Sequence, residues 1–291
     1  MEKTLLKVCN LKKYYGKKLI LNNISCSINQ GEIVGLIGHN GVGKTTLMKC
    51  ILGTTNYDYG SRIFDNNKIK NKECLQNTGA LIEHPGIYPF LTGKENIELL
   101  NSVYSTRKLT YLLNKFQMES FINQKVSSYS LGMQQKLGII EAFLSGSKLV
   151  ILDEPINALD PMSVKKFREA IEYFKNKGIT FLISTHIIDE ISKVADKLWI
   201  LNKKELTELN NKRNTIHIVT VDTSNNAKLK QILKVKNIKY HNKEDKVVIK
   251  CNSSFEVGEW ITTIVKNKLN IDYLDINKND LEDEVLKIME R

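Results

Sequence analysis

Short apolar runs alternate with amphipathic stretches through the first part of the chain. Runs rich in Ile, Val and Leu are typical of strands buried in a parallel sheet, and they cover residues 32–38, 148–153, 179–185 and 197–201. Other stretches repeat apolar residues at helical spacing and predict helices over 44–52, 131–144 and 162–177, with Gly53 and Gly178 as capping residues after the first and the last. Strands that alternate with helices predict an α/β layer architecture.

A change of pattern after residue 202 predicts a second domain. Residues 203–214 are polar and have no clear core face, so we place a boundary at residue 205 and expect domains at 1–205 and 206–291. In the second part, strands are expected at 215–222, 245–251 and 271–276, each followed by a helix, at 226–234, 255–269 and 280–289. This order predicts a small α+β domain of the split βαβ kind.

Composition and charge narrow the class of protein. Hydrophobic content of 42% and charged content of 26% are ordinary for a globular protein. The formal net charge of +11 suits an anionic neighbour such as a nucleotide, a nucleic acid or the inner membrane leaflet. The five cysteines show no CxxC pair or metal spacing and are expected to be reduced thiols. No window approaches the ~20 apolar residues of a membrane span, and the N terminus lacks the pattern of a signal peptide.

A glycine-rich loop stands between the run at 32–38 and the helix expected at 44–52. Its sequence, GHNGVGKTT, matches G-x-x-x-x-G-K-[ST] in the context that this phosphate-binding motif requires. We expect Lys44 to reach the outer phosphates of a nucleotide and Thr45 to hold Mg²⁺. The nucleotide-binding residues of the loop are then Gly38, His39, Asn40, Gly41, Val42, Gly43, Lys44, Thr45 and Thr46.

Two carboxylates, Asp153 and Glu154, end the apolar run in KLVILDEP. Acids often cap strands, but these two follow a strand that is expected to lie beside the phosphate loop. We expect Asp153 to contribute to the Mg²⁺ shell and Glu154 to act as the base that orients or deprotonates water.

With these motifs, the chain resembles the ATP-binding subunit of an ABC transporter over residues 4–202. The resemblance rests on an ordered set of motifs: Tyr15 before Gly16, GHNGVGKTT, the loop at Glu83, YSLGMQQK, LVILDEP, NALD and STH. It implies a P-loop NTPase-type domain, in which a mainly parallel sheet with helices is joined by an antiparallel β subdomain and an α-helical subdomain. It also implies ATP and Mg²⁺ as cofactors, and a homodimer or heterodimer of ATPase subunits with two ATP molecules at its interface.

The resemblance assigns further residues to the ATP site. It implies that Tyr15 stacks on adenine, that His186 contacts the γ-phosphate beside the catalytic Glu154, and that Asp160 communicates across the dimer. On its own, a serine such as Ser130 predicts only a helix N-cap. In the family, the signature segment of one subunit closes over ATP held by the other, which implies nucleotide-binding roles for Ser130, Gly132 and Gln134.

Glu83 departs from the family pattern, because most relatives carry Gln at this position. A carboxylate there can reach Mg²⁺ or the attacking water, and its charge makes the contact depend more on the metal. We therefore count Glu83 among both the nucleotide and the metal residues. With the Pro-Gly and Tyr-Pro that follow it, Glu83 resembles the same position in the bacitracin-resistance and lantibiotic-immunity group of ATP-binding subunits.

The expected function is ATP hydrolysis that powers a separate integral membrane permease, which exports or excludes a peptide antibiotic. The subunit is then expected in the cytoplasm, held on the inner face of the cell membrane by the permease, with no nucleic-acid partner. The alternative is a soluble ABC ATPase that acts on ribosomes or nucleic acid, which the charge of +11 favours. The scattered lysines, without interleaved aromatic residues, favour the transporter.

Overall fold

The computed structural model describes residues 3–71, 73, 75–101, 104–210, 217–236, 238–251, 254–278 and 281–290. The chain divides into two compact units, one of residues 1–211 together with 288–291, and one of residues 212–287. Each unit has its own hydrophobic core.

The first unit begins with a four-stranded antiparallel sheet in the order β2-β1-β4-β5. One face of β1 and β2 is buried, because apolar residues recur at alternate positions along much of both strands. The four strands are β1 (Thr4–Tyr15), β2 (Lys18–Asn29), β4 (Tyr59–Phe64) and β5 (Asn67–Ile69).

The second sheet of this unit has six strands in the order β10-β9-β3-β8-β7-β6. All neighbours run parallel except β10, which is antiparallel to β9. Every residue of β3, β7 and β8 is buried, as expected for central strands covered on both faces. The strands are β3 (Ile33–Ile37), β6 (Thr78–Leu81), β7 (Leu149–Leu152), β8 (Thr180–Thr185), β9 (Lys197–Asn202) and β10 (Glu205–Asn210), which confirms the four strands predicted in this part.

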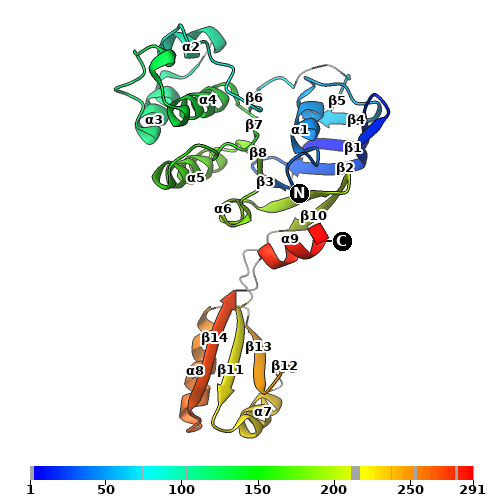
Figure 1. Cartoon of the computed structure of the whole chain (residues 1–291), viewed down its shortest axis with the longest axis vertical. Helices are drawn as coiled ribbons and strands as arrows, with labels where there is room; N and C mark the ends of the chain where they lie inside the picture. Colours follow the sequence, from blue (N-terminus) through cyan, green and yellow to red (C-terminus); the bar gives the residue numbers. More distant parts are fainter. Residues whose placement is uncertain are drawn as a thin grey trace. The chain divides into compact units, whose positions relative to one another are not determined.

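Helix α1 (Lys44–Leu52) lies between the two sheets (Figure 1). Its buried residues Leu47 and Ile51 belong to one core cluster with Leu6 of β1 and Trp199 of β9. Helices α2, α3 and α4 gather at the far end of the six-stranded sheet from the antiparallel sheet, as an α-helical subdomain (Figure 1). The remaining helices are α2 (Gly93–Leu100), α3 (Thr106–Phe116), the short η1 (Val126–Ser128), α4 (Leu131–Ser145), α5 (Pro161–Lys175) and α6 (Ile188–Ser192).

Two boundaries in the first unit differ from the sequence expectations. Residues 205–210 form β10, so this unit continues to residue 211, past the predicted boundary at 205, and the segment 203–214 is not only a connection. The strand is polar because it lies at the edge of the sheet, where few of its side chains are buried. The helix predicted over 162–177 ends at Lys175 with Asn176 as its cap, and Gly178 lies in the following turn with φ of 86°.

The second unit is an antiparallel sheet in the order β12-β13-β11-β14, with two helices on one face. Leu229 and Leu233 of α7 and Trp260 and Ile264 of α8 share its core with alternate residues of the central strands. The elements are β11 (His217–Thr223), α7 (Asn226–Val235), β12 (Tyr240–Lys243), β13 (Lys246–Cys251), α8 (Ser254–Lys266) and β14 (Ile271–Lys278). The predicted α+β fold of the split βαβ kind is therefore present, with β12 as an additional strand.

The last helix, α9 (Leu281–Glu290), ends in the first unit, whereas we predicted that all of 206–291 forms one domain. The side-chain amide of Asn202 donates to the carbonyl oxygens of Ile288 and Met289 at 3.1 and 3.0 Å, which ties the end of α9 to β9. Predicted positions 215, 216 and 280 lie outside the described residues. Within the described ranges, no helix has the length and apolar character needed to cross a bilayer.

Candidate nucleotide-binding site

The phosphate loop joins β3 to α1 and has a backbone that only glycine adopts easily. Gly41 and Gly43 have φ of 77° and 118°, in the left-handed region. A Cβ on Gly38 would lie 2.6 Å from the carbonyl oxygen of Leu201, so a side chain there would force the loop away from β9. Gly43 is the N-cap of α1 and provides no side-chain cap, which leaves the first N–H groups of the helix for an anion.

A hollow opens over this loop. The structure brings most of the predicted loop residues and both predicted acids into its lining, which consists of Ile20, His39, Asn40, Gly41, Gly43, Lys44, Thr45, Thr46, Asp153 and Glu154. Gly38 and Val42 are outside this lining. The carbonyl oxygen of Gly38 accepts a hydrogen bond from Lys44, and the side chain of Val42 packs partly buried against the core.

Lys44 is held at the base of the hollow. Its side chain is only 6% exposed, and its ammonium lies 3.2 Å from Oε1 of Glu154 and donates to the carbonyl oxygen of Gly38 at 2.8 Å. A preorganised, nearly buried ammonium interacts more strongly with an incoming anion than an exposed one does. Lys44 is therefore placed to neutralise the charge of a bound phosphate.

Thr45 and Asp153 meet on one side of the hollow. The Thr45 hydroxyl donates to Oδ2 of Asp153 at 2.6 Å, and the Ser184 hydroxyl donates to the other carboxylate oxygen. A hydroxyl oxygen and a carboxylate oxygen within hydrogen-bond distance are the hard ligands that Mg²⁺ prefers. The chemistry of this pair therefore fits a magnesium site, as the sequence predicted.

Glu154 adopts a left-handed backbone with φ of 47°, which is uncommon for a residue other than glycine and occurs often at functional sites. Its N–H donates to the Ser184 hydroxyl at 2.9 Å, which fixes the turn. Its Oε2 lies 2.9 Å from Nδ1 of His186, whose side chain is half exposed. The carboxylate thus sits between Lys44 and His186, with its orientation set from both sides.

Tyr15 ends β1 with 51% of its side chain exposed, and the ammonium of Lys13 lies 4.9 Å from its ring centroid. An exposed ring at a strand end is suited to stacking against a flat base. Tyr14 donates its backbone N–H to Asp58 and lines a separate hollow on the antiparallel sheet with residues such as Tyr59. The two adjacent tyrosines are thus in different surroundings.

The signature segment begins α4. Ser130 is the N-cap and accepts a hydrogen bond from the N–H of Met133 at 3.3 Å, and Gln134 donates its side-chain amide to the carbonyl oxygen of Tyr129 at 3.3 Å. A Cβ on Gly132 would lie 2.9 Å from the carbonyl oxygen of Ala158, so this helix start lies close against the loop before α5. Ser130, Gly132 and Gln134 are not in the described lining of the chain's own hollow.

Asp160 caps α5 next to the signature helix. Its carboxylate accepts hydrogen bonds from the N–H of Ser163 at 2.9 Å and from the Ser163 hydroxyl at 2.5 Å, and lies 3.8 Å from the ammonium of Lys136. These hydrogen bonds, aided by Lys136, lower the pKa of Asp160 to about 2. Asp160 is thus an anionic helix cap, separate from the described lining of the hollow.

Glu83 lies in the loop after β6 and contacts α1. Its Oε1 is 2.7 Å from the ammonium of Lys49, with 57% of the Glu83 side chain exposed. Like Gly38, Glu154 and His186, it follows the carboxyl end of a strand of the six-stranded sheet. It is absent from the described lining of the hollow, and its carboxylate is paired with Lys49.

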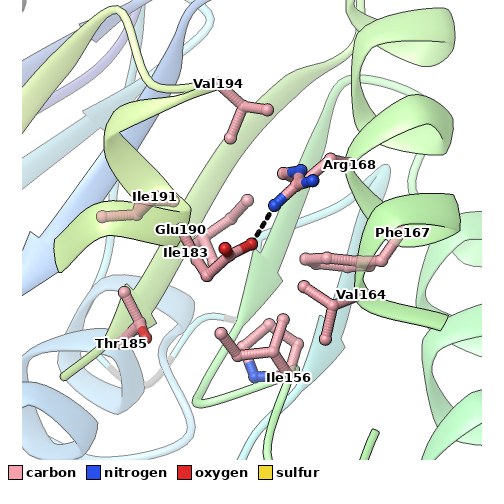
Figure 2. Close-up of a pocket in the computed structure, with 10 residues that line it drawn as sticks. Ile156, Val164, Phe167, Arg168, Ile183, Thr185, Glu190, Ile191 and Val194 are labelled. Carbon is pink, nitrogen blue, oxygen red and sulfur yellow. Dashed lines mark hydrogen bonds and ion pairs between the residues drawn. The ribbon is translucent and has the colours of Figure 1, made fainter. Parts of the chain in front are cut away.

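A second hollow, lined mostly by apolar side chains, lies where residues of α5, β8 and α6 meet (Figure 2). Arg168 of α5 and Glu190 of α6 form an ion pair at this hollow. The apolar part of its lining comes from the loop after β7, from α5, from β8 and from the region of α6, and includes Ile156, Val164, Phe167, Ile183, Ile191 and Val194. Helix α5, which follows Asp160, and α6, which follows His186, therefore line the same hollow and share an ion pair.

Sequence reasoning missed the roles of Ser184 and Lys49. The Ser184 hydroxyl accepts a hydrogen bond from the N–H of Glu154 and donates one to Asp153. Its place in the STH motif, at the end of the neighbouring strand, is the sequence feature that could have predicted this role. Lys49 is one of many lysines, and no sequence pattern distinguishes it. Its pairing with Glu83 follows only from the path of the loop.

Comparison with known proteins agrees with this geometry. The sequence model of the ABC transporter family matches residues 21–157. The lantibiotic transport ATP-binding protein SrtF of Streptococcus pyogenes is 40% identical over 194 residues, which are 66% of this chain and 84% of SrtF. The bacitracin transport ATP-binding protein BcrA of Enterococcus faecalis is 32% identical over 295 residues, which are 96% of this chain and 94% of BcrA.

Solved structures show the same cassette. An ATP-binding subunit of an ABC transporter aligns with a TM-score of 0.65 at 28% identity, over 71% of this chain and 90% of that one. A dimeric bacterial ABC transporter cassette, MJ0796, aligns with a TM-score of 0.65 at 25% identity, over 72% of this chain and 99% of that one. The chain belongs to the ABC transporter family and is the ATP-binding, ATP-hydrolysing subunit of such a transporter. The predicted fold class and enzyme class are confirmed.

Proposed function

We propose that this subunit hydrolyses ATP to power a separate membrane permease that exports or excludes a peptide antibiotic of the lantibiotic or bacitracin type. The observation that carries the ATP-driven part is the meeting of Lys44, Thr45, Asp153 and Glu154 in the lining of one hollow, with His186 paired to Glu154. The peptide-antibiotic part is supported by the names of two relatives, a lantibiotic and a bacitracin transport ATP-binding protein.

The phosphates of ATP bind over the loop from Gly38 to Thr46, where the backbone N–H groups and the start of α1 face them. Lys44 provides the counter-charge and Tyr15 the stacking surface for adenine. Thr45 and Asp153 hold Mg²⁺, which when bound neutralises charge on the phosphate oxygens.

Glu154 orients or deprotonates the attacking water. Its carboxylate is paired with Lys44 and His186, and both of these partners also serve the terminal phosphate in this proposal. Binding of ATP therefore draws the two partners toward phosphate and leaves the Glu154 carboxylate able to accept a proton. In this proposal Glu154 does not act as a base until nucleotide is bound.

A second ATPase subunit completes the site, as a second copy or a relative. Ser130, Gly132 and Gln134 of one subunit bind the ATP held by the other, and Asp160 contacts the partner across the interface. This role is supported by their position outside the described lining of the chain's own hollow and by the likeness to a dimeric cassette. The start of α4 offers its positive end to the γ-phosphate.

The permease contacts the loop and helix that follow Glu83. Large apolar side chains are exposed in this segment, and the rings of Tyr88 and Phe90 lie 5.7 Å apart; the exposed set is Tyr88, Phe90, Leu99 and Leu100. Exposed apolar side chains close together are typical of a protein interaction surface. The subunit therefore works in the cytoplasm on the inner face of the cell membrane, through the permease.

The experiment that tests this function has two parts. The chain is extracted in mild detergent, and we expect it to retain an integral membrane permease. A strain that lacks the chain is then tested against lantibiotics and bacitracin, and wild-type protein is expected to restore resistance whereas Glu154→Gln is not. A soluble ribosomal or nucleic-acid partner, or resistance restored equally by Glu154→Gln, would contradict the proposal.

A further inference from the structure

Glu83 is the central residue of a very tight turn. The N–H of His84 donates to the carbonyl oxygen of Ile82 at 2.9 Å, and Glu83 between them has φ of 64°. A three-residue turn with a positive φ at its centre is rare and strained for a residue other than glycine. A side-chain contact made by Glu83 would offset part of this strain.

That contact is the ion pair with Lys49. Lys49 lies in the last turn of α1, and Thr45 lies four residues earlier on the same helix face. The Lys49 ammonium is 2.7 Å from Oε1 of Glu83, and the Thr45 hydroxyl is 2.6 Å from Oδ2 of Asp153. The residue that holds the Glu83 carboxylate thus lies about one helical turn from Thr45, which belongs to the pair that fits Mg²⁺.

The other side of the turn is fixed by the signature helix. A Cβ on Gly138 of α4 would lie 2.8 Å from Cβ of Pro85 and 2.9 Å from its Cγ. Gly138 therefore permits close approach of the loop to the helix that begins after Ser130. The turn at Glu83 is bounded by α1 through Lys49 and by α4 through Pro85.

We propose that Lys49 is a positioning residue that competes with the Thr45 and Asp153 site for the carboxylate of Glu83. The inference rests on the proposed function, in which Glu83 acts toward Mg²⁺. Both partners of the ion pair are partly exposed, at 27% and 57%, and exposed pairs of this kind are weak and easily exchanged. Lys49 thereby sets how much metal is needed before the loop leaves α1.

The test measures the free Mg²⁺ concentration at half-maximal binding of a fluorescent, non-hydrolysable ATP analogue to the full chain. We expect Lys49→Met to lower this midpoint roughly three- to fivefold, because Glu83 is no longer held by the ammonium. In a Glu83→Gln background, Lys49→Met should leave the midpoint unchanged. If Lys49→Met acted only by removing a positive charge near the metal, it would shift the midpoint equally in both backgrounds. A shift that needs the Glu83 carboxylate shows that the ion pair is responsible.

The matched control is Lys115→Met. Lys115 is 25% exposed and forms one ion pair, with Glu169, at 2.5 Å, away from the nucleotide site. It should not move the Mg²⁺ midpoint. Amide hydrogen exchange gives a second reading without nucleotide: Lys49→Met should speed exchange at His84, and Lys115→Met should not.

Four results are decisive. An unchanged midpoint in Lys49→Met, or an equal shift in the presence and absence of the Glu83 carboxylate, would overturn the role of Lys49. Unchanged exchange at His84 would overturn the claim that the ion pair holds the turn. If the wild-type chain itself neither binds nor hydrolyses ATP, the proposed function fails instead, so the two failures are distinguishable.

Discussion

At the scale of single residues, the nucleotide site is organised by side chains that already have partners. Lys44 and His186 contact Glu154, Thr45 contacts Asp153, and Lys49 contacts Glu83. Glu154 and Glu83 thus have basic partners, and Asp153 has hydroxyl donors, before ATP and metal arrive. Such preorganisation means that binding of ATP and metal exchanges one set of polar contacts for another.

The adenine contact gives the first prediction at this scale. Tyr15→Ala should weaken ATP binding by about 1–3 kcal/mol, because stacking of a base on an aromatic ring contributes this much elsewhere. Isothermal titration with ATP measures it. Tyr14→Ala is the matched control, since Tyr14 lines a different hollow and should leave ATP affinity unchanged. Weaker binding in the Tyr14 variant alone would reverse the assignment.

Glu141 gives a prediction on stability and pH. It is buried in α4, its Oε1 has no hydrogen-bond partner among the described residues, and burial raises its pKa to about 8. Because the folded state binds the proton more tightly than the unfolded state, stability falls as pH rises from about 4.5 toward 8. Glu141→Gln should flatten this dependence and raise the free energy of unfolding at pH 8 by about 1–3 kcal/mol.

Urea unfolding at pH 6 and pH 8 checks the Glu141 prediction. The wild-type chain should lose stability between the two values, and the variant should not. A variant that is less stable than wild type at pH 8 would mean that the carboxylate is charged and paired in the folded chain.

At the scale of elements, the site depends on how closely the strands and helices approach. Gly79 of β6 lies against α4, where a Cβ would be 1.7 Å from the carbonyl oxygen of Ala142. Gly79→Ala should therefore destabilise the chain by about 2–4 kcal/mol, because a backbone oxygen cannot move aside. Gly86→Ala meets nothing within 4 Å and should change stability by less than about 0.5 kcal/mol. Equal stabilities of the two variants in chemical denaturation would contradict this packing.

Hydrophobic patterning predicted the fully buried central strands and missed strands that are partly or mostly exposed, such as β1, β2, β10 and β12. The central strands of the six-stranded sheet are continuous apolar runs, so they were predictable. Strand β10 is mostly exposed, and β12 is the polar segment YHNK, so neither has an apolar pattern to detect. β10 pairs with β9 and β12 pairs with β13. This pairing depends on the tertiary structure, so the residue preferences of a single strand do not predict it.

The candidate site shows the same division. The phosphate loop and the Asp153 and Glu154 pair have sequence patterns that reflect their chemistry, and the structure brings them to one hollow. The ion pair of Lys49 with Glu83 has none, because it depends on a strained turn after β6. The motifs thus predict the residues that bind nucleotide, whereas ion pairs such as Lys49 with Glu83 depend on the folded path of the loops.

At the scale of the whole molecule, the nucleotide site of the first unit lies at the carboxyl ends of its parallel strands. The phosphate loop, the acid pair, His186 and Glu83 follow β3, β7, β8 and β6, which meet along one edge of the six-stranded sheet. The signature segment at the start of α4 is outside the described lining of that hollow. A complete ATP site in our proposal therefore needs two subunits.

The most direct test combines turnover and oligomeric state in Glu154→Gln. The loss of the base should lower ATP hydrolysis by about 10²–10⁴-fold while the phosphate contacts remain, so Mg²⁺ and ATP should convert the variant into a stable dimer in sedimentation measurements. Glu169→Gln, whose carboxylate pairs with Lys115 on the surface, is the control and should hydrolyse ATP normally without accumulating as a dimer. Hydrolysis near the wild-type rate in Glu154→Gln, or a variant that binds ATP and stays monomeric, would contradict the central claim that two subunits enclose ATP for hydrolysis by Glu154.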